Sequence, residues 1–474
     1  MLAQPNVNAP AALVLLALAS CEGPFVAPAP YPPLAAPPAS VTVTPESATV
    51  ITDDTLQLSA VVRDSAGNVL PNVVVSWTSA DTTIAVIASA LGTVRGQRPG
   101  ITRIRAFAGT ITGSVTVFVT PVVFNAFAAG AQHVCAAANN RRVYCWGDND
   151  DGQMGIGTTS FLQAVPKLVA LAPRAVSVAA GGGHSCALTT TGTAYCWGRN
   201  QLGQLGRGPM PGDPLLPNSV LTSQPFIAVT GGGNHTCGLL TSDDISCWGA
   251  NIFGQVGDGF TIDRPTPRPV TATTTWNAVA TGANHTCAIA TDHTAWCWGA
   301  NSDGQLGDST TTNQDVPTVV VGGQQFQTIA AGGGHTCALT TVGAIYCWGR
   351  NVQGQTGTGL PDSIVAVPTA AATVLTFRAV TAGAQHSCGI ATDSAAYCWG
   401  ENGAGQLGDS SNTPRATPVL VHGGLRFQSL SAGAAFTCGL TGGLVLYCWG
   451  DGTQGQLGRA LIGSSSVPVR VAGQ

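Results

Sequence analysis

The sequence predicts an all-β protein in which a small β-sandwich precedes a sevenfold repeat. Fourteen of the fifteen cysteines form seven C-x9-C pairs, and the second cysteine of every pair begins a Cys-Trp-Gly triplet. These second cysteines recur every 50 or 51 residues, a period typical of a solenoid, a propeller or an array. The 61 glycines and the abundance of Thr and Val add a third indication, because they favour many short strands joined by glycine turns.

Composition and charge limit the kinds of partner. The 474 residues are enough for two or more hydrophobic cores. Only 9% of the residues are charged, and the formal net charge is -4. No basic stripe is present, so we expect no nucleic-acid partner.

The N-terminal segment is typical of an exported protein. Residues 9–20 are apolar but too short to remain as a transmembrane helix. They end in Leu18-Ala19-Ser20-Cys21, which resembles a bacterial lipobox and implies a signal peptide over residues 1–21 and a lipid on Cys21. The alternative is an ordinary signal peptide in which Cys21 is incidental. We therefore expect an outer-membrane or cell-surface lipoprotein, or otherwise a secreted protein, with membrane contact only through the N-terminal lipid.

Residues 22–39 are rich in proline and predict an extended, semi-rigid linker. From 40 to 121 the sequence changes to alternating β-branched and polar residues, which predict the strands of a sandwich around one buried tryptophan, Trp77. This segment resembles the bacterial Ig-like domain of group 2 through residues 41–45, 56–60, 75–79 and 113–117. The resemblance implies a stalk or an adhesive module, and we interpret it as a spacer first and a binder second.

From 122 to 474 each repeat follows the pattern of residues 326–357 and ends in Gly-Gln-x-Gly. The complete Gly-Gln-Leu-Gly form stands at residues 203–206, 304–307, 405–408 and 455–458. This pattern resembles the repeat of the regulator-of-chromosome-condensation family, which implies a seven-bladed β-propeller. The fold class we predict is therefore a seven-bladed β-propeller with an N-terminal Ig-like β-sandwich.

The paired cysteines predict a disulfide across a hairpin in each repeat, because two cysteines on facing strands meet the separation that a disulfide requires. The predicted pairs are Cys135 with Cys145, Cys186 with Cys196, Cys237 with Cys247, Cys287 with Cys297, Cys337 with Cys347, Cys388 with Cys398, and Cys438 with Cys448. The alternative is a zinc site built on His-x-Cys, as in His184-Ser185-Cys186. Six repeats have that histidine and the seventh has Phe436, and the usual paired spacing of zinc ligands is missing. We expect no metal, and histidines that hydrogen-bond between neighbouring blades.

Three further expectations concern the blades. Gly192 and Gly343 suit the left-handed position of a three-residue hairpin loop, and the other five repeats lack this glycine, so we expect hairpin turns of different types. The tryptophan that follows each second cysteine lies on the opposite strand face and should pack between blades. The stretches 124–128 and 467–471 correspond to different parts of the repeat, which predicts one blade built from strands of both ends of the domain.

No catalytic motif occurs: there is no GxxxxGK[ST] and no G-x-S-x-G. We therefore expect no enzyme and no cofactor, but an extracytoplasmic binding protein for an unknown protein or glycan. The family resemblance implies two alternatives, guanine-nucleotide exchange and a β-lactamase-inhibitor-like binding of an enzyme. The binding residues are unknown; weak candidates are Arg141 and Arg142 in the first hairpin and the proline-rich loop 209–217.

Overall fold

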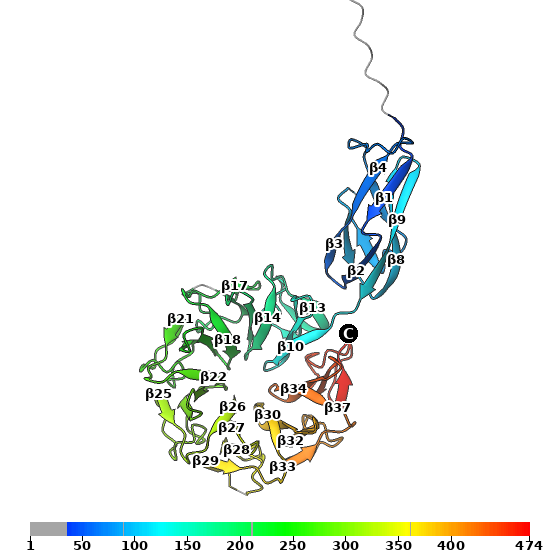
Figure 1. The fold of residues 1–474 in the computed structure, drawn as a ribbon. Helices are drawn as coiled ribbons and strands as arrows, with labels where there is room; N and C mark the ends of the chain where they lie inside the picture. The colour runs from blue at the N-terminus through cyan, green and yellow to red at the C-terminus, as the bar shows by residue number, and fades with distance from the viewer. Residues whose placement is uncertain (1–35, 89, 210–211, 361) are drawn as a thin grey trace, which may run out of the picture.

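The computed structural model describes residues 36–474 except 89, 210–211 and 361, and consists of two units (Figure 1). All of its regular elements in these residues are β-strands. A sandwich over strands β1–β9 precedes a ring of blades over strands β10–β37, which confirms the predicted fold class. No helix of the described residues is long and apolar enough to cross a membrane. The predicted lipidation site Cys21 lies outside the described residues.

The sandwich is made of one four-stranded sheet, one three-stranded sheet and one two-stranded sheet, with the orders β2-β9-β8-β5, β3-β7-β6 and β1-β4. Strand β2 runs parallel to β9, and the other pairs are antiparallel. The bounds are β1 (Ser40–Thr44), β2 (Ser47–Ile51), β3 (Thr55–Gln57), β4 (Ser59–Arg63), β5 (Ser76–Ser79), β6 (Ala85–Ile87), β7 (Thr93–Gly96), β8 (Gly100–Ala108) and β9 (Ile111–Thr120).

Alternating side chains build the core of the sandwich. Along β8, Thr102, Ile104 and Ala106 point inward and are buried, while the residues between them are exposed. Trp77 on β5 is buried in the same core, as predicted. The period of two therefore leaves one face of the four-stranded sheet open to solvent.

Seven four-stranded sheets form the propeller, and each blade uses four strands that follow one another in the chain. The first three blades are, in order, β10 (Phe124–Ala129), β11 (His133–Ala138), β12 (Val143–Asn149) and β13 (Ser160–Leu168); β14 (Ala175–Ala180), β15 (His184–Thr189), β16 (Ala194–Gly198) and β17 (Asn218–Ser219); and β18 (Phe226–Gly231), β19 (His235–Leu240), β20 (Ile245–Gly249) and β21 (Arg264–Pro269). The fourth and fifth blades are β22 (Trp276–Thr281), β23 (His285–Ala290), β24 (Ala295–Gly299) and β25 (Gln314–Val319); and β26 (Phe326–Ala331), β27 (His335–Thr340), β28 (Ile345–Arg350) and β29 (Ile364–Ala370). The sixth and seventh blades are β30 (Phe377–Ala382), β31 (His386–Ala391), β32 (Ala396–Gly400) and β33 (Arg415–Leu420); and β34 (Phe427–Ala432), β35 (Phe436–Thr441), β36 (Leu446–Gly450) and β37 (Ser465–Arg470).

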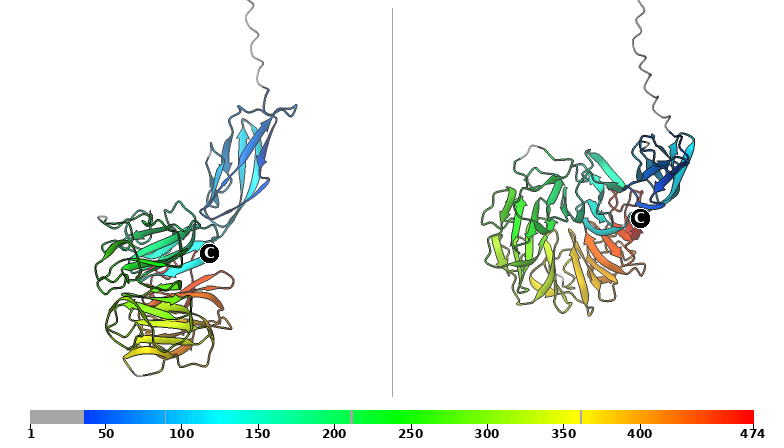
Figure 2. Two further views of the ribbon diagram at one scale, coloured as in Figure 1. Left: turned by 60° about the vertical axis from the view of Figure 1, so that its left-hand side comes forward. Right: turned by 45° about the horizontal axis from the view of Figure 1, so that its top comes forward.

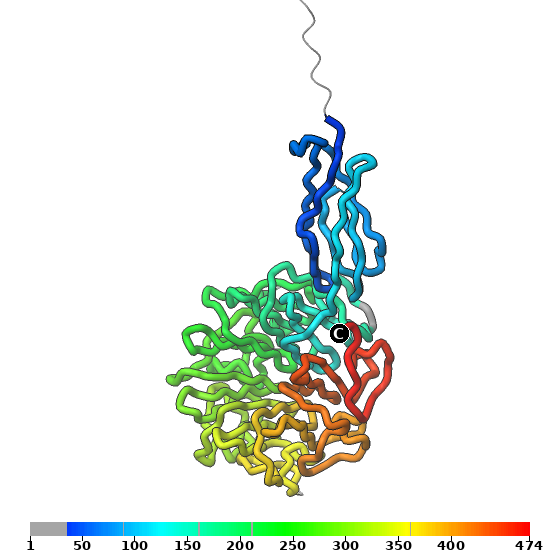
Figure 3. Tube along the Cα trace, turned by 45° about the vertical axis from the view of Figure 1, so that its right-hand side comes forward, coloured from blue at the N-terminus to red at the C-terminus, as the bar shows by residue number. Residues whose placement is uncertain are grey.

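The prediction of a blade shared between both ends of the domain is wrong. The stretch 467–471 falls on β37, which pairs with β36 of the same blade, and the stretch 124–128 begins the first blade on its innermost strand β10. The chain therefore completes each blade from the inside outward before it starts the next one. The tube in Figure 3 shows the first and last blades side by side without an exchanged strand.

The hairpins between the second and third strands of all seven blades have a residue in the left-handed conformation at the same position of the loop. This differs from the mixture of turn types that we expected. Gly192 and Gly343 have φ values of 78° and 87°. The equivalent residues in the other five blades also have positive φ, between 59° and 70°; they are Arg141, Asp243, His293, Ser394 and Leu444. The two strands have the same register in all seven hairpins, so each loop makes the same turn even where the left-handed residue is not glycine.

The alternation of strand directions gives the ring two faces. The loops after the first and third strand of each blade lie on one face, which we call the loop face. The hairpins and the connections between blades lie on the other, which we call the hairpin face. The Ig-like domain extends away from the ring in each view (Figure 1 and Figure 2).

Candidate functional site

Each blade has a disulfide across its inner hairpin, as predicted. The register places the paired cysteines directly opposite each other, with Cα atoms 4.0 to 4.1 Å apart. The bonded pairs are Cys135 with Cys145, Cys186 with Cys196, Cys237 with Cys247, Cys287 with Cys297, Cys337 with Cys347, Cys388 with Cys398, and Cys438 with Cys448. Every one of these cysteines is buried. Among the described residues no group of three or more His, Cys, Asp or Glu side chains is arranged to hold a metal ion.

The tryptophans pack between blades, as predicted, but the disulfides lie in the same seams. Trp348 of the fifth blade packs in one cluster with Cys287 and Cys297 of the fourth, and Trp197 packs likewise against the disulfide of the first blade. The Trp-bearing face of one blade therefore covers the cysteine-bearing face of the preceding blade. We expected the Trp-bearing face to make the contact between blades, and the cysteine-bearing face takes part in it as well.

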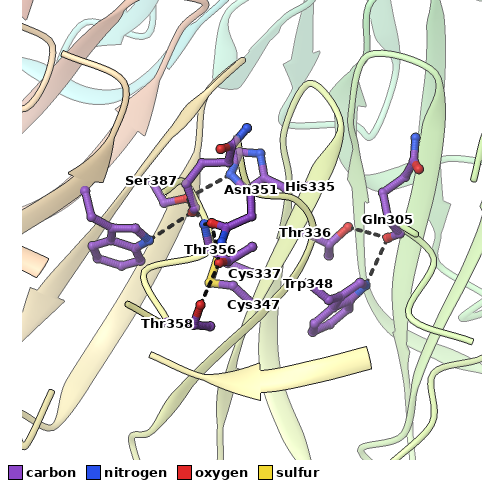
Figure 4. Close-up of a disulfide and its surroundings, with 12 residues drawn as sticks. Gln305, His335, Thr336, Cys337, Cys347, Trp348, Asn351, Thr356, Thr358 and Ser387 are labelled. Carbon is purple, nitrogen blue, oxygen red and sulfur yellow. Dashed lines mark hydrogen bonds between the residues drawn. A yellow bond between two sulfur atoms is a disulfide. The ribbon is translucent and has the colours of Figure 1, made fainter. Parts of the chain in front are cut away.

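A backbone carbonyl of the Gly-Gln-x-Gly turn organises each seam (Figure 4). Between the fourth and fifth blades, the carbonyl oxygen of Gln305 accepts hydrogen bonds from Trp348 Nε1 at 2.9 Å and from Thr336 Oγ1 at 2.8 Å. The Thr336 hydroxyl in turn accepts the ring N–H of His285 at 3.0 Å. Because the hydroxyl donates its only proton to the carbonyl, this network assigns a neutral His285 with the proton on Nε2.

The same histidine–hydroxyl pair, which confirms the predicted contact between blades, occurs in six seams with Nε2···Oγ distances of 2.8 to 3.0 Å. The six histidines are His133, His184, His235, His285, His335 and His386, and all are fully buried. Burial lowers the pKa of each to about 3 or about 4, and repulsion from a neighbouring histidine adds to the effect at His133, His235 and His335. These histidines are neutral structural groups at ordinary pH.

Seven backbone contacts close the ring around its axis. An amide of the loop after each first strand donates to a carbonyl of the next blade, as Ala131 donates to Gly181 at 3.0 Å, and Ala434 of the last blade donates to Ala131 at 3.2 Å. Gly181 must lack a side chain because a Cβ there would collide with the ring of His184 and with the carbonyl of Gly232. The ring is therefore closed by backbone hydrogen bonds as well as by packing.

Small, aliphatic and hydroxyl-bearing side chains line the described cavities of the central channel. The cavity at its loop-face end has a volume of about 170 Å³ and is lined by Gly, Ala and Thr281. Further along the axis the wall adds Val, Leu, Ile, Ser and Thr side chains. A wall without an acid, a base or a histidine supplies no proton-transfer partner.

The loop face differs from blade to blade on a constant framework. In six blades a buried asparagine fixes the long loop after the third strand; Asn301, for example, accepts the amide of Leu306 at 3.0 Å and donates to the carbonyl of Thr312 at 3.0 Å. These asparagines are Asn149, Asn200, Asn251, Asn301, Asn351 and Asn402. The two residues that follow the asparagine differ from blade to blade, so the same framework presents six different loops.

Exposed apolar side chains gather on the loops of the second and third blades, and we call this set the apolar patch. Ile252, Ile262, Phe260 and Leu202 expose 70%, 66%, 56% and 37% of their surface. A groove of about 420 Å³ lies between these loops and is lined by Leu202, Pro209, Asp263 and Pro265, among others. Large exposed apolar side chains next to a groove are typical of a surface that contacts another protein.

One charged pair adjoins the apolar patch, and another lies on the loop face of the following blades. Arg264 forms an ion pair with Asp258 at 2.5 Å and stacks over the ring of Phe260 at 4.9 Å from its centroid. A second ion pair joins the fourth and fifth blades, where Asp303 lies 3.8 Å from Arg350. An apolar centre with a polar rim is the usual anatomy of a protein interface.

The first hairpin faces the Ig-like domain. Arg142 and Arg174 approach the carboxylate of Asp54 at 3.4 and 3.2 Å, and the Tyr144 hydroxyl donates to the carbonyl of Thr52 at 3.5 Å. Burial alone would raise the pKa of Asp54, but the Thr55 amide and the two guanidinium groups hold it below its usual value. The hairpin face at this blade is thus a junction between the domains.

The candidates named from the sequence have different positions. Arg142 is engaged in the junction, whereas Arg141 is exposed at the hairpin tip. The loop 209–217 is described except for residues 210–211, and Pro209 lines the groove beside the apolar patch. Sequence reasoning missed Ile252, Phe260 and Ile262; a comparison of the positions after each asparagine would have found Ile252, since the other repeats have mostly polar residues there.

Two family models match this chain. The RCC1-like domain matches residues 109–376 and 217–473, more than half of the chain, and the group 2 bacterial Ig-like domain matches residues 38–119. Among curated relatives, the human probable E3 ubiquitin-protein ligase HERC4 is 37% identical over 147 residues, which are 30% of this chain and 14% of that protein. The ultraviolet-B receptor UVR8 of Arabidopsis thaliana is 33% identical over 181 residues, 37% of this chain and 38% of the receptor. The chain thus spans well under half the length of these relatives.

Solved structures show the same fold. Human WBSCR16 has a TM-score of 0.65 and 20% identity over 70% of this chain and 94% of its own. Prp20p from Saccharomyces cerevisiae, described with its binding properties to Gsp1p and histones, has a TM-score of 0.62 and 21% identity over 74% of this chain and 87% of its own.

The disulfide in each blade and the bacterial Ig-like domain indicate an extracytoplasmic protein. The blade order, the turn that ends each repeat and the family match agree on the propeller. This chain belongs to the RCC1-like domain family and has a group 2 bacterial Ig-like domain in front of its propeller.

Proposed function

We propose that the chain is a non-enzymatic, extracytoplasmic binding protein that recognises a protein partner with the loop face of its propeller. The observation that carries this proposal is the apolar patch of Leu202, Ile252, Phe260 and Ile262 beside a groove of about 420 Å³. The patch favours a protein over a glycan, because aliphatic side chains bury well against apolar protein surface. The Gly- and Ala-lined channel supports a role without catalysis.

The Ig-like domain acts in this proposal as a stalk. Its contact with Arg142 and Arg174 occupies the hairpin face at the first blade and leaves the loop face uncovered by the domain. A lipid on Cys21 and the linker 22–39 would attach the stalk to a membrane surface. A Cys21→Ser variant tests the anchor: the proposal expects release into the soluble fraction, and retention in the membrane would contradict it.

Nucleotide exchange receives less support. Prp20p has been described with binding to Gsp1p, but small GTPases act in the reducing cytosol, where seven disulfides do not persist. Binding of an extracytoplasmic enzyme, as in β-lactamase-inhibitor-like proteins, is compatible with the loop face and is one form of the proposed function.

Charge substitutions on the two faces test the proposal. In a quantitative pull-down from the cell envelope, the variant Ile252→Lys with Ile262→Lys should recover on the order of tenfold less of the protein partner than the wild type does. Charges at the centre of an apolar contact are costly. The matched variant Val342→Lys with Val374→Lys changes two valines of the hairpin face that are 80% and 100% exposed. Equal recovery of the partner by both variants would overturn the loop-face assignment.

A further inference from the structure

The open face of the Ig-like domain's four-stranded sheet carries two arginines for which the described residues provide no side-chain partner. Arg103 and Arg105 are both exposed on β8, the same strand that buries Thr102, Ile104 and Ala106. Successive outward residues of a strand lie about 7 Å apart, so the two guanidinium groups rise side by side from one surface. Neither forms a side-chain hydrogen bond or an ion pair with any described residue.

The other arginines of this domain are engaged locally. Arg63 donates to the carbonyl of Gly67 at 2.9 Å, Arg95 pairs with Asp53 at 3.1 Å, and Arg98 donates to Thr83 at 3.0 Å. The two free arginines are therefore a property of one face and not of the whole domain. Their like charges repel each other and no carboxylate of the sheet offsets this.

Protection of a sheet edge does not explain the pair. In the order β2-β9-β8-β5, strand β8 lies inside the sheet, where both of its neighbours already satisfy its backbone. Charges that guard against aggregation belong on edge strands, whose backbone groups are unpaired.

Hydroxyl groups flank both arginines. Thr116 lies opposite Arg103, and Ser114 and Thr78 lie on either side of Arg105 in the register. We call Arg103, Arg105, Thr78, Ser114 and Thr116 together the arginine strip. Its members offer two exposed cations and several hydroxyl donors and acceptors on the outward face of the sheet.

Aromatic and apolar residues lie at both ends of the strip. Phe107 follows Arg105 on the same face, and Ile101 pairs with Phe118 before Arg103, with exposures of 61% and 40% for the latter two. The domain as a whole extends away from the ring (Figure 2). The exposed residues follow one another along neighbouring strands, an arrangement that suits a linear polymer better than a small molecule, which usually binds in a concave pocket.

We propose that the arginine strip binds an anionic polysaccharide, in which carboxylate or sulfate groups pair with Arg103 and Arg105 and sugar hydroxyls pair with Thr78, Ser114 and Thr116. Guanidinium groups bind such anions in a bidentate manner, and aromatic rings pack against the apolar faces of sugars. A phosphate polymer or an anionic membrane shares the charge and also accepts hydrogen bonds from hydroxyl groups, but neither offers the sugar rings that would pack against Phe107 and Phe118, so both are outcomes of the test. The Ig-like domain thereby acts as a second contact site, independent of the loop face.

Retention on immobilised polygalacturonate tests this proposal with the full processed chain. The wild type should be retained and eluted by salt, and neutral dextran should retain nothing. The affinity of the variant Arg103→Gln with Arg105→Gln for polygalacturonate should fall by on the order of tenfold or more. The matched variant Arg63→Gln with Arg98→Gln removes the same charge from exposed positions of the same domain and should bind within about twofold of the wild type.

Three results would overturn the proposal: equal weakening by both double variants, no retention of the wild type on polygalacturonate, and binding only to polyphosphate or to phosphatidylglycerol vesicles. Unchanged melting of the Ig-like domain in both variants ensures that a loss of binding reflects the lost cations. Retention by the Ile252→Lys, Ile262→Lys variant should equal that of the wild type, which separates this proposal from the function of the loop face.

Discussion

Six seams of the propeller and the seventh seam, which closes the ring, are built differently. In the six, a buried histidine donates to a Ser or Thr hydroxyl of the next blade, and that hydroxyl donates to a backbone carbonyl. In the closing seam the histidine position is Phe436 and the hydroxyl position is Val134, and both are buried in one apolar cluster. The tryptophan contact is kept: Trp146 Nε1 donates to the carbonyl of Gln456 at 3.0 Å.

In the closing seam both partners of the polar pair are absent together, and two apolar side chains that pack in one cluster stand in their places. A histidine at 436 would face a valine and leave a buried N–H without an acceptor, which is costly. The closing seam joins residues 310 positions apart in the sequence, so it pays the entropy of the longest loop in the ring. Apolar packing is non-directional, and it stabilises such a long-range contact without the exact alignment that a buried hydrogen bond needs.

The largest expected effect is the loss of propeller stability in acid, because acid protonates the histidines of six seams and the closing seam has none. The six buried histidines have pKa values of about 3 to 4 in the fold and about 6.5 when unfolded, so the unfolded chain binds more protons in between. Their contribution is complete above about pH 6.5 and is lost as the pH falls toward 4. At about pH 5 each histidine costs roughly 2 kcal/mol, and six such costs rival the whole stability of a domain.

Calorimetry between about pH 7 and pH 4 checks this expectation. The propeller transition should move to much lower temperature, while the Ig-like domain, which has no histidine, provides the internal reference. A propeller that melts at one temperature over this range would contradict the assignment of neutral buried histidines.

An intermediate effect comes from making the closing seam resemble the others. Phe436→His should cost about 3 kcal/mol, because it removes apolar contacts and buries an unpaired N–H. Adding Val134→Thr supplies the missing hydroxyl, which can also donate to Gln456, and should restore about 1–2 kcal/mol. Denaturant unfolding of the four members of this double-mutant cycle measures the coupling. Strictly additive effects would show that the two positions do not form a pair.

The smallest effect concerns the place where the Ig-like domain meets the first blade. Asp54→Asn should destabilise by less than about 1 kcal/mol, because the side chains of Asp54 and Arg174 are 19% and 44% exposed and water screens the ion pair. Since the pKa of Asp54 is lowered in the fold, the contribution is present at neutral pH and lost in acid. Faster limited proteolysis of residues 120–123 is the measurable outcome. Destabilisation of the whole propeller by several kcal/mol would contradict a peripheral junction.

Much of the fold was predictable because the same residues recur at a regular spacing along the sequence. The C-x9-C spacing places paired cysteines opposite each other, and the recurring Trp and His positions mark the seams. The missing hydroxyl of the closing seam is also visible in the sequence, because Val134 follows His133 at the position where Ser185 follows His184. The similarity of residues 124–128 and 326–330 shows where the repeat starts, but not that this strand is innermost.

Contacts made by the backbone or between domains left no pattern to recognise. The acceptor in each seam is the backbone carbonyl of a glutamine. Every residue type has a backbone carbonyl, so the residue type does not reveal this role. The contact of Arg142 with Asp54 joins positions 88 residues apart that no repeat relates. The apolar patch is likewise a matter of exposure, and an isoleucine in a loop has the same letter whether it is buried or free.

Site-specific photo-crosslinking tests the central claim most directly. A photoreactive amino acid would be placed at Ile252 on the loop face and, in a second variant, at Val342 on the hairpin face, and both would be irradiated in intact cells of the source organism. We predict a discrete protein adduct from position 252 and none from position 342. Adducts from position 342 alone, or equally from both positions, would contradict recognition through the loop face.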